Sequence, residues 1–422
     1  MDFTRRQMMA AAAAVPVAGR VSAAPPTVAA VRPDDEAYWA SVAAQYDVMR
    51  DVIQLENGNW GMMARPVLAH YEMAVRRVNR ETSYYARRSL TPDLVAVRDR
   101  VAAKMGVAPQ EIAFTRNATE ALKALIIGYN RLRPGDAVLH ADLDYDSMQA
   151  CLASLKHSRG VDLLSIALPE PATYQGLIDA YEAALKANPK VRLILLTHLS
   201  HRTGLVLPVR EIVAMARARG VDAIVDAAHS WGQLDFRPAD LDADFIGFNL
   251  HKWWGAPLGV GVIYIRKSKI DLIDPDSANS PPFAANSQAR VHTGTVDFAA
   301  QLTVPAAMDF QDGIGDAARA ARLSYLRNLW TETLRGTTGL EILTPADPRL
   351  HGCITSFRFA GRTSVQDNAA IAKRLLDEYR IFSVHRDGPA RGACVRITPA
   401  LFNSVSDIRA LEKAIPKLLG SF

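Results

Sequence analysis

Short apolar segments alternate with helical patterns between residues 110 and 265. The expected strands are Glu111–Thr115, Ala137–His140, Val161–Ile166, Val191–Thr197, Asp222–Asp226, Asp244–Phe248 and Gly261–Ile265. The expected helices between them are Glu120–Asn130, Ser147–Arg159, Gly176–Ala187 and Val209–Gly220. This alternation predicts an α/β fold with a mainly parallel sheet sandwiched by helices. In such a sheet, ligands bind at the carboxyl ends of the strands.

The pattern changes after about residue 300. A long helical pattern covers Pro305–Arg335 and a second covers Val365–Tyr379, while Cys353–Phe359, Ile381–His385 and Ala393–Ile397 have the pattern of strands. We therefore expect a large domain over residues 61–300 and a smaller α+β domain over residues 301–422. Residues 25–60 are expected to pack with the small domain.

Charge and cysteine content exclude several classes of partner. The formal net charge of the 422 residues is only +5, and the basic residues are dispersed along the chain, so we expect no nucleic-acid partner. Three cysteines without a CxxC pair predict neither a disulfide framework nor a zinc site. After the N-terminus, no apolar segment is long enough for a stable membrane anchor.

The first 24 residues have the order of an export signal. Arg5 and Arg6 precede the weakly apolar segment Met9–Ala18, and small residues follow up to Ala24. The paired arginines are typical of a twin-arginine signal. We expect export by the twin-arginine machinery and a periplasmic mature protein that begins near Ala24 or Pro25. The alternative is an ordinary amphipathic first helix.

Two polar residues lie where apolar strands end. Asp226 ends one apolar strand, and Lys252 follows another, between His251 and two tryptophans. A desolvated lysine has a lowered pKa and becomes a nucleophile that forms Schiff bases. A carboxylate is the partner that keeps the pyridine nitrogen of pyridoxal 5′-phosphate (PLP) protonated. The pair therefore indicates PLP chemistry.

With these residues in place, the chain resembles the class V aminotransferases of fold-type I, and among them the isopenicillin N epimerase-like subgroup. The resemblance runs from about Gln54 to Asn403 and rests on several blocks in the right order. They are Thr115-Arg-Asn-Ala-Thr-Glu120, Val225-Asp-Ala-Ala-His229, Asn249-Leu-His-Lys-Trp-Trp254, His292-Thr-Gly-Thr295 and Val395-Arg-Ile-Thr-Pro399. The resemblance implies a sheet of the seven-stranded type, PLP as the cofactor and a homodimer with shared active sites.

The same resemblance implies a role for each site residue. Lys252 would form the Schiff base and move protons, and Asp226 and His229 would contact the cofactor ring beside it. Ala118 and Thr119 lie at the start of a helix, where free N–H groups suit a phosphate. The remaining cofactor contacts would come from Asn249 and His251 at the phosphate, Tyr145 stacked on the ring, His201 at the ring hydroxyl, and Thr295 reaching the partner's phosphate.

Substrate contacts are expected from three further residues. Arg396 would hold the α-carboxylate, for which a guanidinium has the right geometry. Asn59 lies in a glycine-rich turn that would line the substrate pocket, and Trp60 is either a wall of that pocket or part of the core. His198 and His201 are not expected to bind a metal, because no cysteine or carboxylate ligand motif lies near them.

The residues do not decide the reaction, because related sites carry out several. Epimerisation and transamination fit best, with Lys252 as the base. Cysteine desulfuration needs a cysteine on a mobile loop, whereas Cys394 lies in an expected strand and Cys151 in an expected helix. A non-catalytic protein on the same scaffold stays open as an alternative. An NAD-dependent dehydrogenase is rejected, because Gly259-Val-Gly261 is not followed by the helix of a dinucleotide site.

Overall fold

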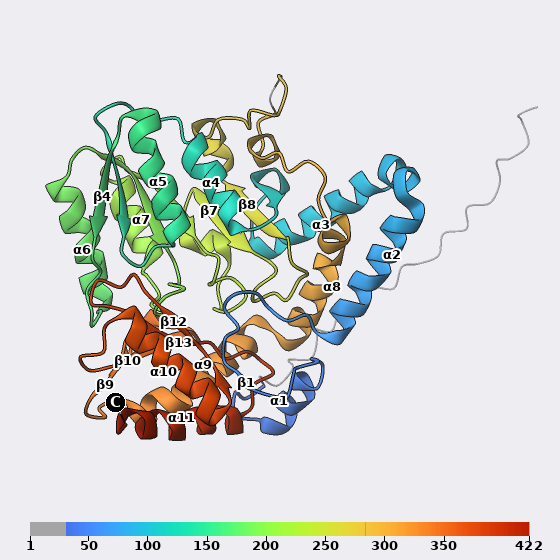
Figure 1. The fold of residues 1–422 in the computed structure, drawn as a ribbon. Helices are drawn as coiled ribbons and strands as arrows, with labels where there is room; N and C mark the ends of the chain where they lie inside the picture. Colours follow the sequence, from blue (N-terminus) through green and yellow to red (C-terminus); the bar gives the residue numbers. More distant parts are fainter. Residues whose placement is uncertain (1–30, 283, 422) are drawn as a thin grey trace, which may run out of the picture. The chain divides into compact units, whose positions relative to one another are not determined.

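A seven-stranded mixed sheet forms the centre of the fold (Figure 1). The computed structural model describes residues 31–282 and 284–421, so the signal predicted for residues 1–24 lies outside the described residues. The strand order is β2-β8-β7-β6-β5-β3-β4. Their bounds are β2 Ile112–Thr115, β3 Ala137–Ala141, β4 Asp162–Ile166, β5 Val191–Thr197, β6 Asp222–Asp226, β7 Phe245–Asn249 and β8 Gly261–Ile265. The strand β8 runs opposite to the other six, and the remaining pairs are parallel, so the predicted mainly parallel sheet is confirmed.

Helices cover the sheet with their apolar sides. Helix α4 (Ala118–Gly128) packs against β6, β7 and β8, and α5 (Asp146–Arg159) lies beside it, both in front of the sheet in Figure 1. Helix α7 (Val209–Arg217) packs on β6 and on α6 (Tyr174–Ala187). Fully buried apolar side chains of α4, α5 and the strands join in one core cluster, which fixes the sheet edge where the strands end.

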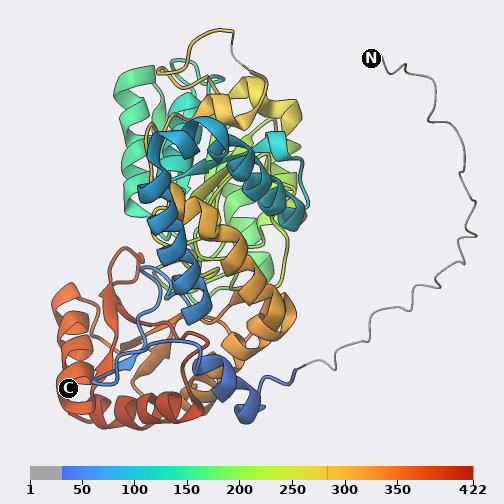
Figure 2. The ribbon, with the colours of Figure 1, turned by 90° about the vertical axis from the view of Figure 1, so that its right-hand side faces the viewer.

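The region before the sheet is helical, although the sequence pattern predicted no helix there. It contains α1 (Glu36–Ala43), α2 (Arg65–Arg88) and α3 (Leu90–Met105), and both α2 and α3 pack on α8 (Phe298–Ile314). Figure 2 shows α2 and α8 side by side. Of the 24 residues of α2, only Val67, Ala74 and Tyr85 are buried, and the helix is kinked at Thr82, whose backbone is not helical.

The C-terminal part has its own sheet and core. An antiparallel sheet in the order β12-β13-β10-β9 consists of β9 Leu340–Ile342, β10 Thr355–Phe359, β12 Val384–Arg386 and β13 Cys394–Ile397. It is accompanied by α9 (Asp316–Leu334), α10 (Val365–Tyr379) and α11 (Val405–Leu419). The strand β1 (Ile53–Gln54) pairs in parallel with β11 (Ile381–Phe382). Residue Leu55, next to β1, is buried in this second core.

Two expected elements are divided in the structure. The single helix expected over Pro305–Arg335 is two helices, α8 and α9, because Gly315 between them has a φ of +91°. The helix α8 begins at Phe298 and includes Pro305. The strand expected over Ile381–His385 is β11 and β12, which separate at Ser383 because β11 bonds to β1 and β12 bonds to β13.

Short 3-10 helices complete the fold at Pro109–Glu111, Pro238–Leu241, Lys267–Leu272, Ser287–Arg290 and Pro348–Leu350. All these elements belong to one unit that begins at Arg32. Within residues 31–282 and 284–421, no helix is both long and apolar enough to cross a bilayer.

Candidate active site

A cavity of about 450 Å³ opens at the carboxyl ends of the central strands. Its volume is in the range of small-molecule sites. Most of the residues predicted for the site line it: Asn59, Ala118, Thr119, Tyr145, His201, Asp226, His229, Asn249, His251, Lys252 and Arg396. The topology brings them together because β5, β6 and β7 are parallel neighbours whose ends meet at one edge of the sheet.

The amine of Lys252 is buried among polar groups. Its Nζ lies 2.9 Å from Nε2 of His229. The pKa of Lys252 is lowered to about 8, mainly by burial; the charges of Asp226 and Glu56 oppose this shift, and those of Arg396 and Arg386 add to it. Burial, followed by the charge of Lys252, also holds the pKa of His229 well below its usual value. The amine of Lys252 therefore shares a hydrogen bond with a neutral imidazole, whose tautomer sets which group donates.

The carboxylate of Asp226 stands at the end of β6 and is 5% exposed. Its Oδ1 accepts the backbone N–H of Ala228 at 2.9 Å. Burial raises the pKa of Asp226, whereas the hydrogen bond from Ala228 and the charge of Lys252 lower it. A carboxylate that is buried beside a cation is suited to hold a protonated ring nitrogen.

The first turn of α4 forms the opposite side of the cavity. The side chain of Asn117 caps the helix by accepting the N–H of Glu120 at 2.9 Å. The N–H of Ala118 donates to Oδ1 of Asn249 at 2.8 Å. Two residues expected at a phosphate therefore bond to each other, and the amide nitrogen of Asn249 is the group of this pair that can donate to a phosphate. Thr119 and His251 line the same side.

Aromatic rings form a third side of the cavity. The ring of Tyr145 contacts His201 edge to face at a centroid distance of 5.3 Å. The rings of His201 and His229 are nearly parallel, with 19° between their planes and 6.5 Å between their centroids. Burial, and then the charge of Arg202, keep the pKa of His201 well below its usual value. His201 is thus a neutral donor or acceptor in the cavity.

The lysine loop is held by a close backbone contact that the sequence did not reveal. The N–H of Gly61 donates to the carbonyl of His251 at 2.8 Å. A Cβ on Gly61 would lie 1.8 Å from the carbonyl oxygen of Lys252. Only glycine permits this approach.

Arg396 lies in β13 and is paired within the chain. Its Nη2 donates to Oε1 and Oε2 of Glu56 at 2.5 and 2.7 Å, and its Nη1 donates to the carbonyl of His201 at 2.6 Å. Sequence reasoning missed Glu56. Its partner is 340 residues away, and no local pattern marks a carboxylate as the partner of a distant arginine. The one local hint is Gly58, where a Cβ would lie 2.8 Å from Nη2 of Arg396.

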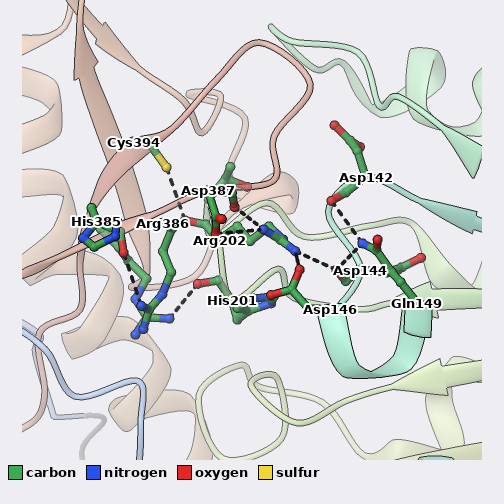
Figure 3. Close-up of polar contacts among 12 residues, drawn as sticks. Asp142, Asp144, Asp146, Gln149, His201, Arg202, His385, Arg386, Asp387 and Cys394 are labelled. Carbon is green, nitrogen blue, oxygen red and sulfur yellow. Dashed lines mark hydrogen bonds and ion pairs between the residues drawn. The ribbon is translucent and has the colours of Figure 1, made fainter. Parts of the chain in front are cut away.

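Arg202 links the start of α5 to the segment after β12, and the sequence analysis did not identify it. Its guanidinium forms an ion pair with Asp146 and another with Asp387, the latter at 3.6 Å. Figure 3 shows Arg202 between these two carboxylates. The N–H of Ala390 donates to Oδ2 of Asp142 at 2.8 Å. These bonds fix the segment after β12 on the loop that precedes α5.

Two predicted residues lie away from the cavity within this chain. Trp60 is 54% exposed and therefore belongs neither to the cavity lining nor to the core. Thr295 is exposed and does not line the cavity. Thr295 was expected at the cofactor phosphate of a partner subunit, so that expectation stays a prediction, whereas the two roles expected for Trp60, pocket wall or core, are both wrong.

The cysteines and His198 do not line the cavity. Cys353 and Cys394 are buried, and Cys151 is half-buried in α5. Burial raises the pKa of Cys394 to about 11, so its thiol is not ionised. His198 packs on Phe236. Across the described part of the chain, no group of three or more metal-ligating side chains is assembled.

The sequence has relatives with known names. The family model described as "Aminotransferase class-V" matches residues 65–410. Isopenicillin N epimerase from Amycolatopsis lactamdurans is 30% identical over 90% of this chain and 98% of its own length. Putative L-cysteine desulfhydrase 1 from Oryza sativa subsp. japonica is 26% identical over 92% of this chain and 88% of its own length.

Solved structures have the same fold. An apo cysteine desulfurase from Thermococcus onnurineus NA1 superposes with a TM-score of 0.75 at 20% identity, over 90% of this chain and 98% of that chain. A C-DES variant with glycine covalently linked to its PLP cofactor gives a TM-score of 0.75 at 22% identity, over 88% and 98% of the two chains. Because the sequence match covers most of the residues and the fold agrees with it, the chain belongs to the aminotransferase class-V family.

Proposed function

We propose that the chain binds PLP on Lys252 and acts at the α-carbon or amine of an amino acid or an amino-acid-derived metabolite. The observation that carries the proposal is the convergence of the buried Lys252 amine, the Asp226 carboxylate and the first turn of α4 in one cavity. These residues fit the cofactor: an amine to bond its aldehyde, a carboxylate for its ring nitrogen, and Thr119 and the Asn249 amide at the start of α4 for its phosphate.

The residues that line the cavity would have separate roles in the reaction. Bound PLP withdraws electrons and makes the α-proton of the substrate acidic. The amine of Lys252, with its pKa lowered to about 8, takes and returns a proton near neutral pH. His229 lies 2.9 Å from this amine and orients it. Asp226 and Asn249 would hold the ring nitrogen and the phosphate, Tyr145 would stack on the ring, and His201 would contact the ring hydroxyl.

Epimerisation or transamination is the reaction we propose, in line with the isopenicillin N epimerases among the relatives. Relatives named as cysteine desulfurases and desulfhydrases support elimination or desulfuration as a second candidate. A persulfide route is disfavoured because, in the described chain, no cysteine lines the cavity.

Two further proposals concern the setting of the enzyme. We propose a homodimer in which the exposed Thr295 reaches the partner's cofactor phosphate. We also propose export by the twin-arginine pathway to the periplasm, from the order of charged and apolar residues in positions 1–24.

Reduction of the purified protein with borohydride tests the cofactor proposal. The protein should be yellow, should lose its colour on reduction, and should gain mass only on the peptide that contains Lys252. The Lys252→Ala variant should hold PLP reversibly and be inactive. The matched control is Lys267→Ala, which removes an exposed lysine and should behave as the wild type. A colourless protein, or an adduct on another lysine, would reject the proposal and favour a non-catalytic role.

The reaction class is then decided with purified enzyme in deuterated water. Amino acids and small peptides with free amines are incubated with it, and the products are analysed for chirality, keto acid, sulfide and deuterium at the α-carbon. Inversion with deuterium uptake identifies an epimerase, and keto acid identifies an aminotransferase. Sulfide release would replace both with the second candidate.

A further inference from the structure

We propose that Arg202 is a positioning residue for the cofactor ring: by tying Asp146 to Asp387, it sets where Tyr145 stands in the cavity. The inference rests on the proposed function, because it takes PLP to occupy this cavity. Tyr145, Asp146 and Asp387 line the cavity, whereas Arg202 is not among the lining residues. Arg202 therefore acts on the cofactor through the residues that it holds.

The backbone of Arg202 is fixed by the C-terminal sheet. Its carbonyl accepts from Oγ of Ser356 in β10 at 2.6 Å and from Sγ of Cys394 in β13 at 3.7 Å. Its N–H donates to Oγ of Ser200 at 3.1 Å. The side chain of Arg202 is only 2% exposed. Because the backbone is bonded and the side chain is buried, the guanidinium is held in place for its partners.

On one side, the guanidinium of Arg202 holds the two residues that flank Tyr145. It forms an ion pair with Asp146, the first residue of α5. Its Nη2 also donates to the backbone carbonyl of Asp144 at 3.4 Å. Since Tyr145 lies between these two residues in the chain, a shift of its backbone would have to break at least one of these contacts.

Asp144 is also anchored through its side chain. Its Oδ1 accepts the backbone N–H of Thr197 at 3.0 Å and the hydroxyl of Thr197 at 2.6 Å. Thr197 ends β5 and lines the cavity. The chain before Tyr145 is thus fixed to the sheet, and the ion pair between Arg202 and Asp146 fixes the chain after it.

On the other side, the guanidinium packs on the backbone of the segment after β12, residues 387–391. It donates to the carbonyl of Asp387 and forms an ion pair with the carboxylate of Asp387 at 3.6 Å. A Cβ on Gly388 would overlap with Nη1 of Arg202, and Gly388 has a φ of +97°, so this position requires glycine. Figure 3 shows the guanidinium between Asp146 and Asp387. The position of Tyr145 therefore depends on the segment after β12.

The charges require a cation between the two carboxylates. The side chains of Asp146 and Asp387 are 66% and 71% exposed, so water can solvate both of them without Arg202. The buried guanidinium needs them, because an unpaired buried charge is costly. Without Arg202, the two carboxylates would remain close to each other, and repulsion between like charges would separate the start of α5 from the segment after β12.

Hydrogen exchange of the purified protein, measured by mass spectrometry, tests the tie itself. In Arg202→Gln, the amides of residues 142–148 and 387–392 should both exchange at least about 10-fold faster than in the wild type. In Asp146→Asn, which cuts one side only, residues 142–148 should exchange faster while residues 387–392 keep their protection. The matched control Arg219→Gln breaks a surface ion pair with Glu182 and should leave both segments unchanged.

Circular dichroism of the bound cofactor tests the positioning of the ring. The PLP chromophore is achiral, so its visible dichroism comes from the groups that hold it. Arg202→Gln and Asp146→Asn should lose most of the dichroism per bound PLP, whereas Asp146→Glu, which keeps the carboxylate, should retain most of it. Tyr145→Leu should lose it as well. Adding Arg202→Gln to Tyr145→Leu should remove no more, because two changes that act through one residue are not additive.

Three results would overturn the inference. The first is unchanged exchange of residues 142–148 in Arg202→Gln and Asp146→Asn; if Arg202→Gln does not fold, Asp146→Asn decides alone, since its side chain is exposed. The second is wild-type dichroism per bound PLP in variants whose residues 142–148 exchange faster. The third is a further loss of dichroism when Arg202→Gln is added to Tyr145→Leu.

The proposed function fails separately. A protein that carries PLP on Lys252 and gives any of these three results loses only the role of Arg202. A protein without PLP rejects the proposed function and the part of the inference that concerns the ring, while the exchange rates still decide whether Arg202 ties the two segments together.

Discussion

The amine of Lys252 and Nε2 of His229 lie 2.9 Å apart, although 23 residues separate them in the chain. The contact forms because His229 follows β6, Lys252 follows β7, and these strands are parallel neighbours. Both groups are buried, and burial favours the uncharged form of each. The site therefore contains a nucleophilic amine whose free form is already populated near neutral pH.

The lowered pKa of Lys252 predicts the pH dependence of cofactor capture. Only the unprotonated amine attacks the aldehyde of PLP, so the capture rate of the apoprotein should rise about tenfold per pH unit and level off near pH 8. The growth of visible absorbance after mixing, followed from pH 6 to 10, measures this. Nα-acetyl-lysine is the control and should level off above pH 10. A plateau of the protein's rate at that higher pH would contradict the burial argument.

The Asp226→Asn variant tests whether the charge of Asp226 raises the pKa of Lys252. The negative charge of Asp226 raises the pKa of Lys252. Its removal should therefore shift the pH midpoint of PLP capture downward, below that of the wild type. An upward shift would mean that Asp226 does not act on the amine through its charge.

Gly61 is predicted to be essential for the lysine loop. In Gly61→Ala, the new Cβ would meet the carbonyl oxygen of Lys252 at 1.8 Å, so the backbone of this loop must move. We expect most of the bound PLP to be lost and the free energy of unfolding to fall by about 1–3 kcal/mol. Cofactor absorbance and urea unfolding measure the two effects.

Gly313→Ala is the matched control, because Gly313 lies in α8 with open space around its Cβ position. Alanine there should leave PLP binding unchanged and stabilise the protein by up to about 1 kcal/mol through its helix propensity. Equal loss of PLP in both variants would show that the close approach of Gly61 to Lys252 is unimportant.

The sequence predicted the site residues that lie at the ends of strands. Asp226 and Lys252 were found because a polar residue after a buried strand of a parallel sheet faces the ligand edge. Glu56 could not be found in this way, since its partner Arg396 is reached only when β1 joins the C-terminal part. The helix α2 was also missed; it is mostly polar, with only three buried residues among 24.

Export is tested by replacing Arg5 and Arg6 together with lysine. The twin-arginine pathway needs the arginine pair and not only its charge, so the variant should stay in the cytoplasm as a precursor that still holds PLP. Fractionation and immunoblotting of the producing bacterium measure this. The control is Arg20→Lys, outside the pair, which should be exported normally. Normal export of the double variant would reject a twin-arginine signal.

The shared active site is tested by combining two inactive variants. Lys252→Ala lacks the Schiff-base lysine. In Thr295→Glu, the added carboxylate should repel the cofactor phosphate of the partner subunit by like charge. Each homodimer should therefore be inactive, provided that Thr295 reaches across the dimer while Lys252 and Asp226 act within their own subunit.

Mixed dimers of these variants contain one site of each kind. In one site, the Lys252→Ala cavity meets the Thr295→Glu loop, and both contributions are broken. In the other, the unaltered cavity of the Thr295→Glu subunit meets the unaltered loop of the Lys252→Ala subunit, so that site is whole. Co-expressed subunits with two different affinity tags allow the mixed dimer to be purified, and its activity should reach about half that of the wild type. If Thr295 acted within its own subunit, both sites of the mixed dimer would be defective and no activity would return.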